Sequence, residues 1–274
     1  MYSESSRLFP TVAIGIALTL QAVPLAGQSS QWLDGRSDKH LALEILKPNF
    51  DEGLNTTFAT QAWFLSLRYA LSPKVALIAD VPYAHYGADG SPDTESTIGN
   101  PYIGIEARGE DSPISGEFGI RLPLVSEDNS SAQFVGAFAD IDRWEAFWND
   151  IVPISAMVNA RWKSQQGAVA KLRAGPTLWA STGEDTETEL LLDYTAQIGY
   201  EGEWGSVIGG FTGVMLVTQD EANFGERTYH QLGVAGSLRF NRVMPGMSVR
   251  LPLDEFMKDI HDVVVGVHVS IELN

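Results

Sequence analysis

The feature that most constrains the fold is a period-two alternation of apolar and polar residues, which recurs along the chain after residue 30. In the clearest segment, 262–273, valine, isoleucine or leucine fills every second position, and most positions between them are polar or glycine. Successive side chains of a β-strand point to opposite sides, so each such segment has one apolar and one polar face. No apolar run after residue 30 approaches the about 18–20 residues that a transmembrane helix needs. The alternation therefore predicts an all-β fold.

About twelve segments alternate in this way, and most are about ten to fourteen residues long. They exceed the about 5–6 residues of most soluble strands and suit tilted strands that cross a membrane. Short turns alternate with longer loops between them, as in bacterial outer-membrane barrels. We therefore expect a single antiparallel up-and-down transmembrane β-barrel of about 12 strands. The expected strands are 39–49, 57–70, 74–84, 98–108, 114–125, 151–163, 167–180, 188–201, 204–217, 228–241, 246–253 and 262–273.

The charged side chains of these segments indicate which face points inward. A charge on the lipid face costs about 2–4 kcal/mol at mid-depth, so we expect the charged face to line a lumen. Basic groups outnumber acidic groups on this face, which predicts a mild preference for anions. The residues expected to line the lumen are Arg68, Lys74, Asp80, Glu106, Arg108, Glu117, Arg121, Arg161, Lys163, Lys171, Arg173, Asp193, Glu201, Arg239, Arg250 and Glu272.

The net charge argues against a nucleic-acid partner. With 18 Lys plus Arg against 35 Asp plus Glu, the formal net charge is −17, and no basic field can neutralise phosphates. The chain has no cysteine, which excludes disulfides, thiolate zinc sites and thiol nucleophiles. Acidic residues gather in the longer loops, where we interpret them as solvated charge. Divalent-cation binding at the rim is the alternative, although no calcium-loop spacing is present. We predict neither a metal site nor a cofactor.

The first residues have the layout of a secretory signal peptide. Arg7 precedes an apolar run from Phe9 to Leu20, and small residues follow at Ala26 and Gly27. The run is short for a membrane span, and a retained N-terminal anchor is the alternative. We expect a signal peptide over 1–27 and a barrel domain over 28–274. The expected location is the outer membrane of a Gram-negative bacterium, with membrane lipid and the outer-membrane assembly machinery as partners.

Four stretches in the middle of the chain carry a resemblance to a known family. They are KVALIADVPY (74–83), IGNPYIGIE (98–106), GEFGIRLPL (116–124) and EAFWND (145–150). They resemble a family of outer-membrane barrels described as transporters or as the phenol-degradation MetA-pathway family. The resemblance implies a channel for small, aromatic or apolar compounds and implies no catalytic residues. The chain departs from a common feature of outer-membrane barrels, because it ends in Leu273-Asn274 rather than in an aromatic residue.

The histidines give no catalytic or metal site. His40, His85, His230, His261 and His268 are not at metal-ligand spacing from one another. His268 and Ser270 share one face of the last expected strand, but this is the lumen face, and the sequence places no third group to orient the histidine. We therefore interpret His268 as a polar lumen residue and predict that the protein is not an enzyme.

The longest loop, 126–150, predicts a short amphipathic helix. Apolar residues recur at three-to-four-residue spacing, and Asp140 or Asp142 lies where a helix could begin. One alternative places the helix outside, on the barrel mouth or the lipid interface, where tryptophans are common. The other folds the loop inward, so that it narrows the lumen and offers apolar surface to a small aromatic solute. The candidate constriction residues are Phe138, Trp144, Phe147 and Trp148.

Three functional interpretations follow. The first is a passive channel or transporter of the outer membrane for small solutes, aromatic or apolar in character. The second is a structural or adhesive barrel whose lumen is plugged by paired charges. The third is a secreted β-sandwich, whose strands would be shorter and whose connections would not alternate in length so regularly.

Overall fold

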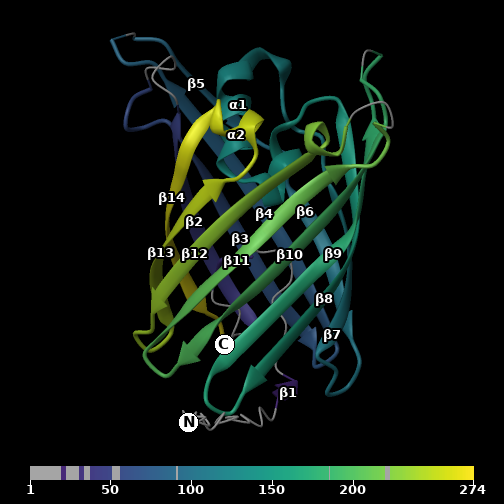
Figure 1. Cartoon of the computed structure of the whole chain (residues 1–274), viewed down its shortest axis with the longest axis vertical. Coiled ribbons are helices and arrows are strands. Elements are labelled where there is room, and N and C mark those ends of the chain that lie inside the picture. The colour runs from purple at the N-terminus through teal and green to yellow at the C-terminus, as the bar shows by residue number, and fades with distance from the viewer. Residues whose placement is uncertain are drawn as a thin grey trace, which may run out of the picture.

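The fold is a closed antiparallel barrel of 12 strands (Figure 1). The computed structural model describes residues 20–22, 31–33, 38–50, 56–90, 92–184, 186–219 and 223–274. Each strand pairs with its neighbours in chain order, and β14 closes the ring against β2. The elements of the ring are β2 (Lys39–Phe50), β3 (Gln61–Ser72), β4 (Val75–Gly87), β5 (Thr94–Ile98) with β6 (Tyr102–Arg108), β7 (Ile114–Arg121), β8 (Ile151–Ser164), β9 (Ala168–Ser181), β10 (Glu189–Gly202), β11 (Gly205–Leu216), β12 (Thr228–Leu238), β13 (Val243–Pro252) and β14 (His261–Glu272).

These strands confirm the predicted fold class, with one difference in the wall. Of the strand expected over 98–108, residues 102–108 form β6, whereas Ile98 ends β5, which begins before the expected segment at Thr94; both β5 and β6 pair with β4. Pro101 has no N–H to donate, and Asn100 between the two strands turns inward and is fully buried. Next to this interruption β7 ends at Arg121, four residues before the expected end. The secreted β-sandwich is therefore excluded by the closed ring.

The polar faces of the strands point into the barrel, and the apolar faces form its outer wall. In β2, buried residues alternate with half-buried ones along most of the strand. On the outer wall, Ile198 is 73% exposed and Phe118 is 62% exposed. Apolar surface on this scale needs lipid or a partner to cover it. The inside-out distribution thus agrees with a barrel that spans a membrane.

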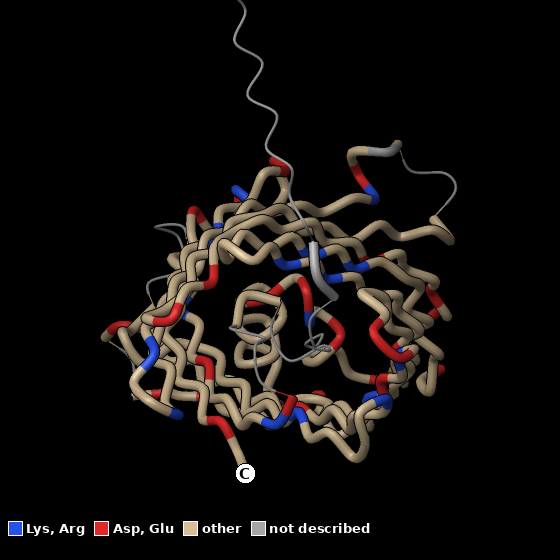
Figure 2. The backbone as a smooth tube through the Cα atoms, turned by 90° about the horizontal axis from the view of Figure 1, so that it is seen from below, with Lys and Arg blue, Asp and Glu red and all other residues tan. Residues whose placement is uncertain are grey.

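The longest loop folds into the barrel and occupies its loop end. It contains η1 (Glu127–Asn129), α1 (Ser130–Ala139) and η2 (Ile141–Phe147), and we call residues 127–147 the plug. Figure 2, viewed from the end of the short turns, shows this coil inside the ring of strands. The short helix predicted for this loop is present, but the α-helix spans Ser130–Ala139, and the segment after Asp140, where the apolar spacing placed it, forms the 3₁₀ helix η2. The loop lies inside the ring rather than on the lipid interface, and its role as a constriction stays a prediction. Glu95 of β5 holds the start of α1, because its carboxylate accepts the main-chain N–H groups of Ser131 and Ala132.

Three shorter elements complete the described chain. η3 (Phe224–Glu226) and α2 (Glu255–Lys258) lie in loops at the same end as the plug. β1 (Leu20–Ala22) pairs with residues 162–164 of β8, outside the ring. It falls within the predicted signal peptide, most of which lies outside the described residues. Among the described residues, no helix has the length and apolarity to cross a membrane.

Candidate functional site

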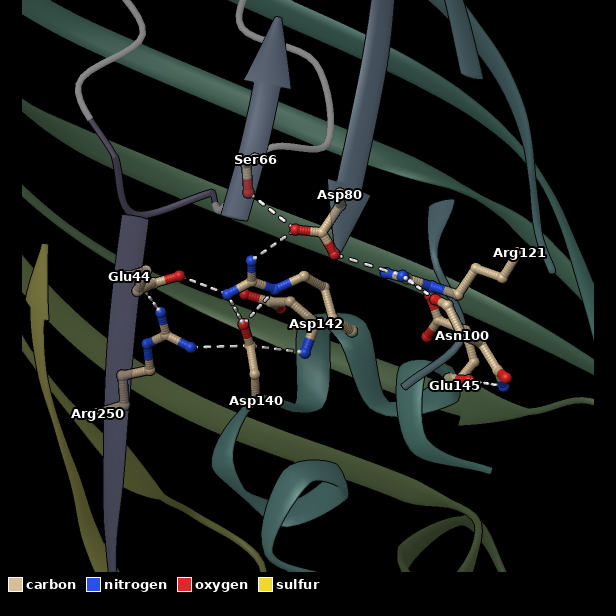
Figure 3. A network of polar contacts seen from close by, with 10 residues as sticks. Glu44, Ser66, Asp80, Asn100, Arg121, Asp140, Asp142, Glu145 and Arg250 are labelled. Carbon is tan, nitrogen blue, oxygen red and sulfur yellow. Dashed lines mark hydrogen bonds and ion pairs between the residues drawn. The ribbon is translucent and has the colours of Figure 1, made fainter. Parts of the chain in front are cut away.

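A buried network of charges joins the plug to the barrel wall (Figure 3). Its centre is Arg143 of η2, which is 1% exposed. The Arg143 guanidinium donates to Glu44 of β2 and, at 2.7 Å, to Asp140 of the plug. It also lies 3.5 Å from Asp80 of β4 and 3.5 Å from the centre of the Phe64 ring. A buried cation needs such partners, so the plug is held where the wall supplies them.

Arg250 of β13 closes this network from the opposite side. Its guanidinium donates to Glu44 Oε1 at 2.7 Å and lies 2.8 Å from Asp140 Oδ1. Glu44 and Asp140 thus each contact both Arg143 and Arg250, and the four charges balance. Burial alone would raise the pKa of Asp140, but the two guanidiniums hold it below its usual range. Asp140 therefore stays ionised in the network.

A second group of contacts fixes the other side of the plug. Arg121 at the end of β7 donates to Glu145 of the plug at 2.8 Å and lies 3.4 Å from Asp80. Asn100, at the interruption between β5 and β6, donates to the main-chain oxygens of Glu145 and Trp148. Its side-chain oxygen accepts the N–H groups of Leu124 and residue 125. One buried amide thus joins the wall to the plug.

The N-terminal segment 31–33 contacts the plug from the lumen. The Trp32 indole donates to Asp142 Oδ2 at 3.0 Å, and the Thr212 hydroxyl donates to the other carboxylate oxygen. Trp32 is 2% exposed and lies against Gly233, where a Cβ would come within 2.5 Å of the indole. Burial and the nearby Asp140 raise the pKa of Asp142 to about 6. A cavity of about 20 Å³, enough for about one water molecule, lies beside Asp142.

An aromatic cluster covers the plug at the loop end of the barrel. The ring centres of Trp144 and Tyr229 are 4.8 Å apart, and those of Trp144 and Trp179 are 5.8 Å apart. Phe138 and Trp148 extend the cluster, at 6.3 and 5.9 Å from Trp144. Within the described part of the chain, the indole N–H groups of Trp144 and Trp179 have no hydrogen-bond partner. The cluster therefore offers apolar rings together with two unused donors.

Most of the remaining predicted lumen residues lie on the inner wall in separate ion pairs. Glu106 and Glu117 face each other in register, but each pairs with an arginine from another strand. Arg68 binds Glu106 through two hydrogen bonds, and Arg173 binds Glu117 at 2.8 Å. The other pairs are Arg161 with Glu201, Lys163 with Glu201, Arg239 with Glu272, and Arg108 with Asp38; Asp193 accepts from Thr177, and Lys171 donates to Leu33. Lys74 differs, because it is exposed in a turn and pairs with Glu110.

Several residues of the site were not predicted. Glu44 stands on the polar face of its strand, so the alternation itself marks it. Arg143 and Asp140 carried no such signal, because a loop sequence does not show whether the loop folds inward. These residues add four carboxylates to the lumen but only one basic group, Arg143. The carboxylates are those of Glu44, Asp140, Asp142 and Glu145. The basic surplus expected from the strands is therefore reduced among the described residues.

The sequence also raised His268 and Ser270, and possible groups of metal ligands, as candidates for a catalytic or metal site. His268 and Ser270 both lie buried on the inner wall, as expected for lumen residues. Among the described residues, no three His, Asp or Glu side chains are placed together to hold a metal ion.

The comparisons with known proteins bear on the fold. The sequence matches no protein family and no curated protein. The structure is similar to the COG4313 outer membrane channel from Pseudomonas putida F1, with a TM-score of 0.59, 9% identity, and coverage of 88% of this chain and 98% of that chain. It is also similar to the NanC porin, with a TM-score of 0.54, 7% identity and coverage of 86% and 100%. For LpxR from Salmonella typhimurium the TM-score is 0.50, at 12% identity and coverage of 85% and 100%. At these identities the likeness establishes a shared barrel fold.

Proposed function

We propose that the protein is an outer-membrane channel that is closed by its plug and opens when the plug leaves the wall. The inward plug, bonded to β2, β4 and β13 through Arg143 and its partners, is the observation that carries this proposal. A plug that only filled space would need apolar packing, which usually equals or exceeds a buried ion pair in stability. Ion pairs instead confer a defined docked position that a change of charge can release. The channel and porin named among similar structures support the class.

The proposed solutes are small and aromatic or apolar. The aromatic cluster over the plug supports this class, because stacked and edge-to-face rings gain about 0.5–1.5 kcal/mol beyond burial. The unused indole donors of Trp144 and Trp179 favour solutes that carry a hydrogen-bond acceptor, as a phenol does. The resemblance of the middle of the chain to phenol-degradation transporters agrees with this proposal, although no family match supports it.

Removal of the Arg143 charge tests the gate. In Arg143→Gln, Glu44 and Asp140 lose a buried partner, which costs the docked state roughly 3–5 kcal/mol. We expect single-channel recordings in planar bilayers to show frequent, larger conductance steps, and deletion of residues 132–147 to give a permanently raised conductance. The matched control is Lys74→Gln, which removes an exposed charge at a turn.

The alternative is a structural barrel whose lumen never opens. The number of bonds between the plug and the wall favours it. Folded Arg143→Gln and deletion variants that both conduct no better than the native protein would establish this alternative and refute the channel.

The solute class has its own test. Phenol added to the loop side should block the ion current of the open native channel. Trp179→Leu should weaken this block several-fold, since a ring and a donor are lost from the wall of the cluster. Trp204→Leu is the control, because Trp204 is 83% exposed at the opposite end of the barrel. Equal block of the ion current by phenol in both variants would exclude the aromatic cluster as the solute site.

A further inference from the structure

Three polar side chains, those of Tyr194, His230 and Asp254, are linked by hydrogen bonds on the outer side of the barrel, toward its loop end. Tyr194 of β10, Gly213 of β11 and His230 of β12 stand side by side in register. They point outward, because the adjacent residues Thr195 and Thr212 are buried on the inner wall. Tyr194 Oη lies 2.6 Å from His230 Nε2. A Cβ on Gly213 would lie 2.6 and 2.7 Å from the two rings, so the bare glycine permits their contact.

Asp254, which follows β13, fixes the orientation of the histidine. One carboxylate oxygen accepts the main-chain N–H of His230, and the other lies 3.0 Å from His230 Nδ1. A carboxylate can only accept, so in the neutral imidazole Nδ1 carries the proton and Nε2 is left to accept the hydroxyl of Tyr194. The order carboxylate, imidazole, hydroxyl is the one that activates a nucleophile in acyl transfer.

We propose that Tyr194, His230 and Asp254 form an acyl-transfer site for lipid-like esters on the outer wall, and we call these residues the outer-wall triad. Tyr194 is the nucleophile, His230 is the general base, and Asp254 positions the imidazole. A phenol is a stronger acid than an alkyl hydroxyl, and tyrosine is among the residues that form covalent intermediates. This activity is separate from conduction, because the outer-wall triad lies on the other side of the wall from the plug.

The apolar wall below the outer-wall triad accounts for the class of substrate. Phe211 stacks on His230 with ring centres 5.2 Å apart and planes 24° apart. Phe211 faces Leu232 in register, and Leu232 faces Leu251. The two leucines are 45% and 47% exposed, so they form an apolar strip open to an acyl chain. A water-soluble substrate has no acyl chain to bury against this apolar strip, whereas the acyl chain of an ester in the membrane can pack along it.

The proposed reaction balances without a cofactor. Tyr194 Oη attacks the ester carbonyl carbon and forms a C–O bond, while His230 Nε2 takes the phenol proton. The tetrahedral intermediate breaks its bond to the alcohol oxygen, and His230 gives the proton to the departing alcohol. Water then attacks the acyl-tyrosine and gives its proton to His230, which returns it to Tyr194 as the carboxylic acid leaves.

Covalent labelling tests the activation of Tyr194 directly. The folded full-length protein in detergent is treated with an aryl fluorophosphonate, and the labelled peptides are quantified by mass spectrometry. Tyr200 is an internal control, because it lies on the same strand and face and is 56% exposed. We expect Tyr194 to be labelled about 100-fold faster than Tyr200, in line with the about 10²–10⁴-fold effect of a positioned base. His230→Gln should remove this difference. Equal labelling of the two tyrosines in the native protein overturns the proposal.

Turnover of a long-chain ester distinguishes catalysis from mere reactivity. p-Nitrophenyl decanoate in mixed micelles should be hydrolysed by the native protein, and Tyr194→Phe and His230→Gln should each lose about 100-fold of the rate. The matched control is His85→Gln, whose ring contacts Ser96 Oγ on another strand. Heat-dependent migration in SDS confirms that each variant is folded. Native hydrolysis no faster than that of folded Tyr194→Phe would refute the site.

Discussion

Arg143 shows how a single side chain determines the state of the lumen. The guanidinium contacts carboxylates from β2, β4 and the plug itself, and none of these partners is more than 2% exposed. The strand residues of this network, Glu44, Asp80 and Arg250, alternate with apolar neighbours, and their inward direction follows from the sequence. Their pairing partners do not, because Arg143 and Arg250 both bind Glu44, which is far from each of them in the chain. Sequence thus predicts the lining of the lumen but not the network that fills it.

Asp142 gives the plug a dependence on pH. Its pKa is raised to about 6 in the docked plug, against about 3.9 when solvated. A raised acid pKa means that the docked state binds the proton more tightly, so docking is stabilised as the pH falls below about 6 and loses this stabilisation as the pH rises. We expect fewer openings at pH 5 than at pH 7.5 in single-channel recordings. Asp142→Asn should abolish most of this difference, and an unchanged pH profile in that variant would exclude Asp142 as its source.

At the scale of elements, the strands were predictable and their interruption was not. Alternation placed β8, β9 and β10 to within a residue at most ends, because one wholly apolar face fixes both the direction and the register of a strand. The interruption between β5 and β6 lies instead at Asn100, whose four side-chain hydrogen bonds all go to residues outside these two strands. A helix in the plug was predictable from the apolar spacing, but its bounds were not, and its docking depends on these distant contacts.

Asn100→Ala should loosen the plug without opening the ring. The variant leaves two main-chain N–H groups and two main-chain oxygens without a partner, at about 1–3 kcal/mol for each group that stays buried. We expect longer open times in single-channel recordings and an unchanged yield of folded barrel. Asn149→Ala is the control, since Asn149 makes one local bond to Asp150. Equal open times for the two variants would show that Asn100 does not hold the plug.

For the whole molecule, the distribution of charge predicts the ion selectivity. The strands contribute a basic surplus to the lumen, and the plug opposes it with Asp140, Asp142 and Glu145 against Arg143 alone. Deletion of residues 132–147 removes these four charges together. We therefore expect the reversal potential in a potassium chloride gradient to move toward anion selectivity in the deletion variant. A shift toward cations would mean that the acidic loops, rather than the lumen, control permeation.

The seam between β2 and β14 sets an order for biogenesis. Glu272 pairs with His40, and the N–H of Leu273 binds the main-chain oxygen of Lys39, so the ring stays open until the last strand has been made. Trp32 precedes the first of these strands and lies inside the finished wall. Contacts so distant in sequence form late, because the loop they close is almost the whole chain. Pairing of β14 with β2 is thus the step that encloses the N-terminal segment in the barrel. A chain without β14 keeps two unpaired sheet edges, and such edges promote aggregation.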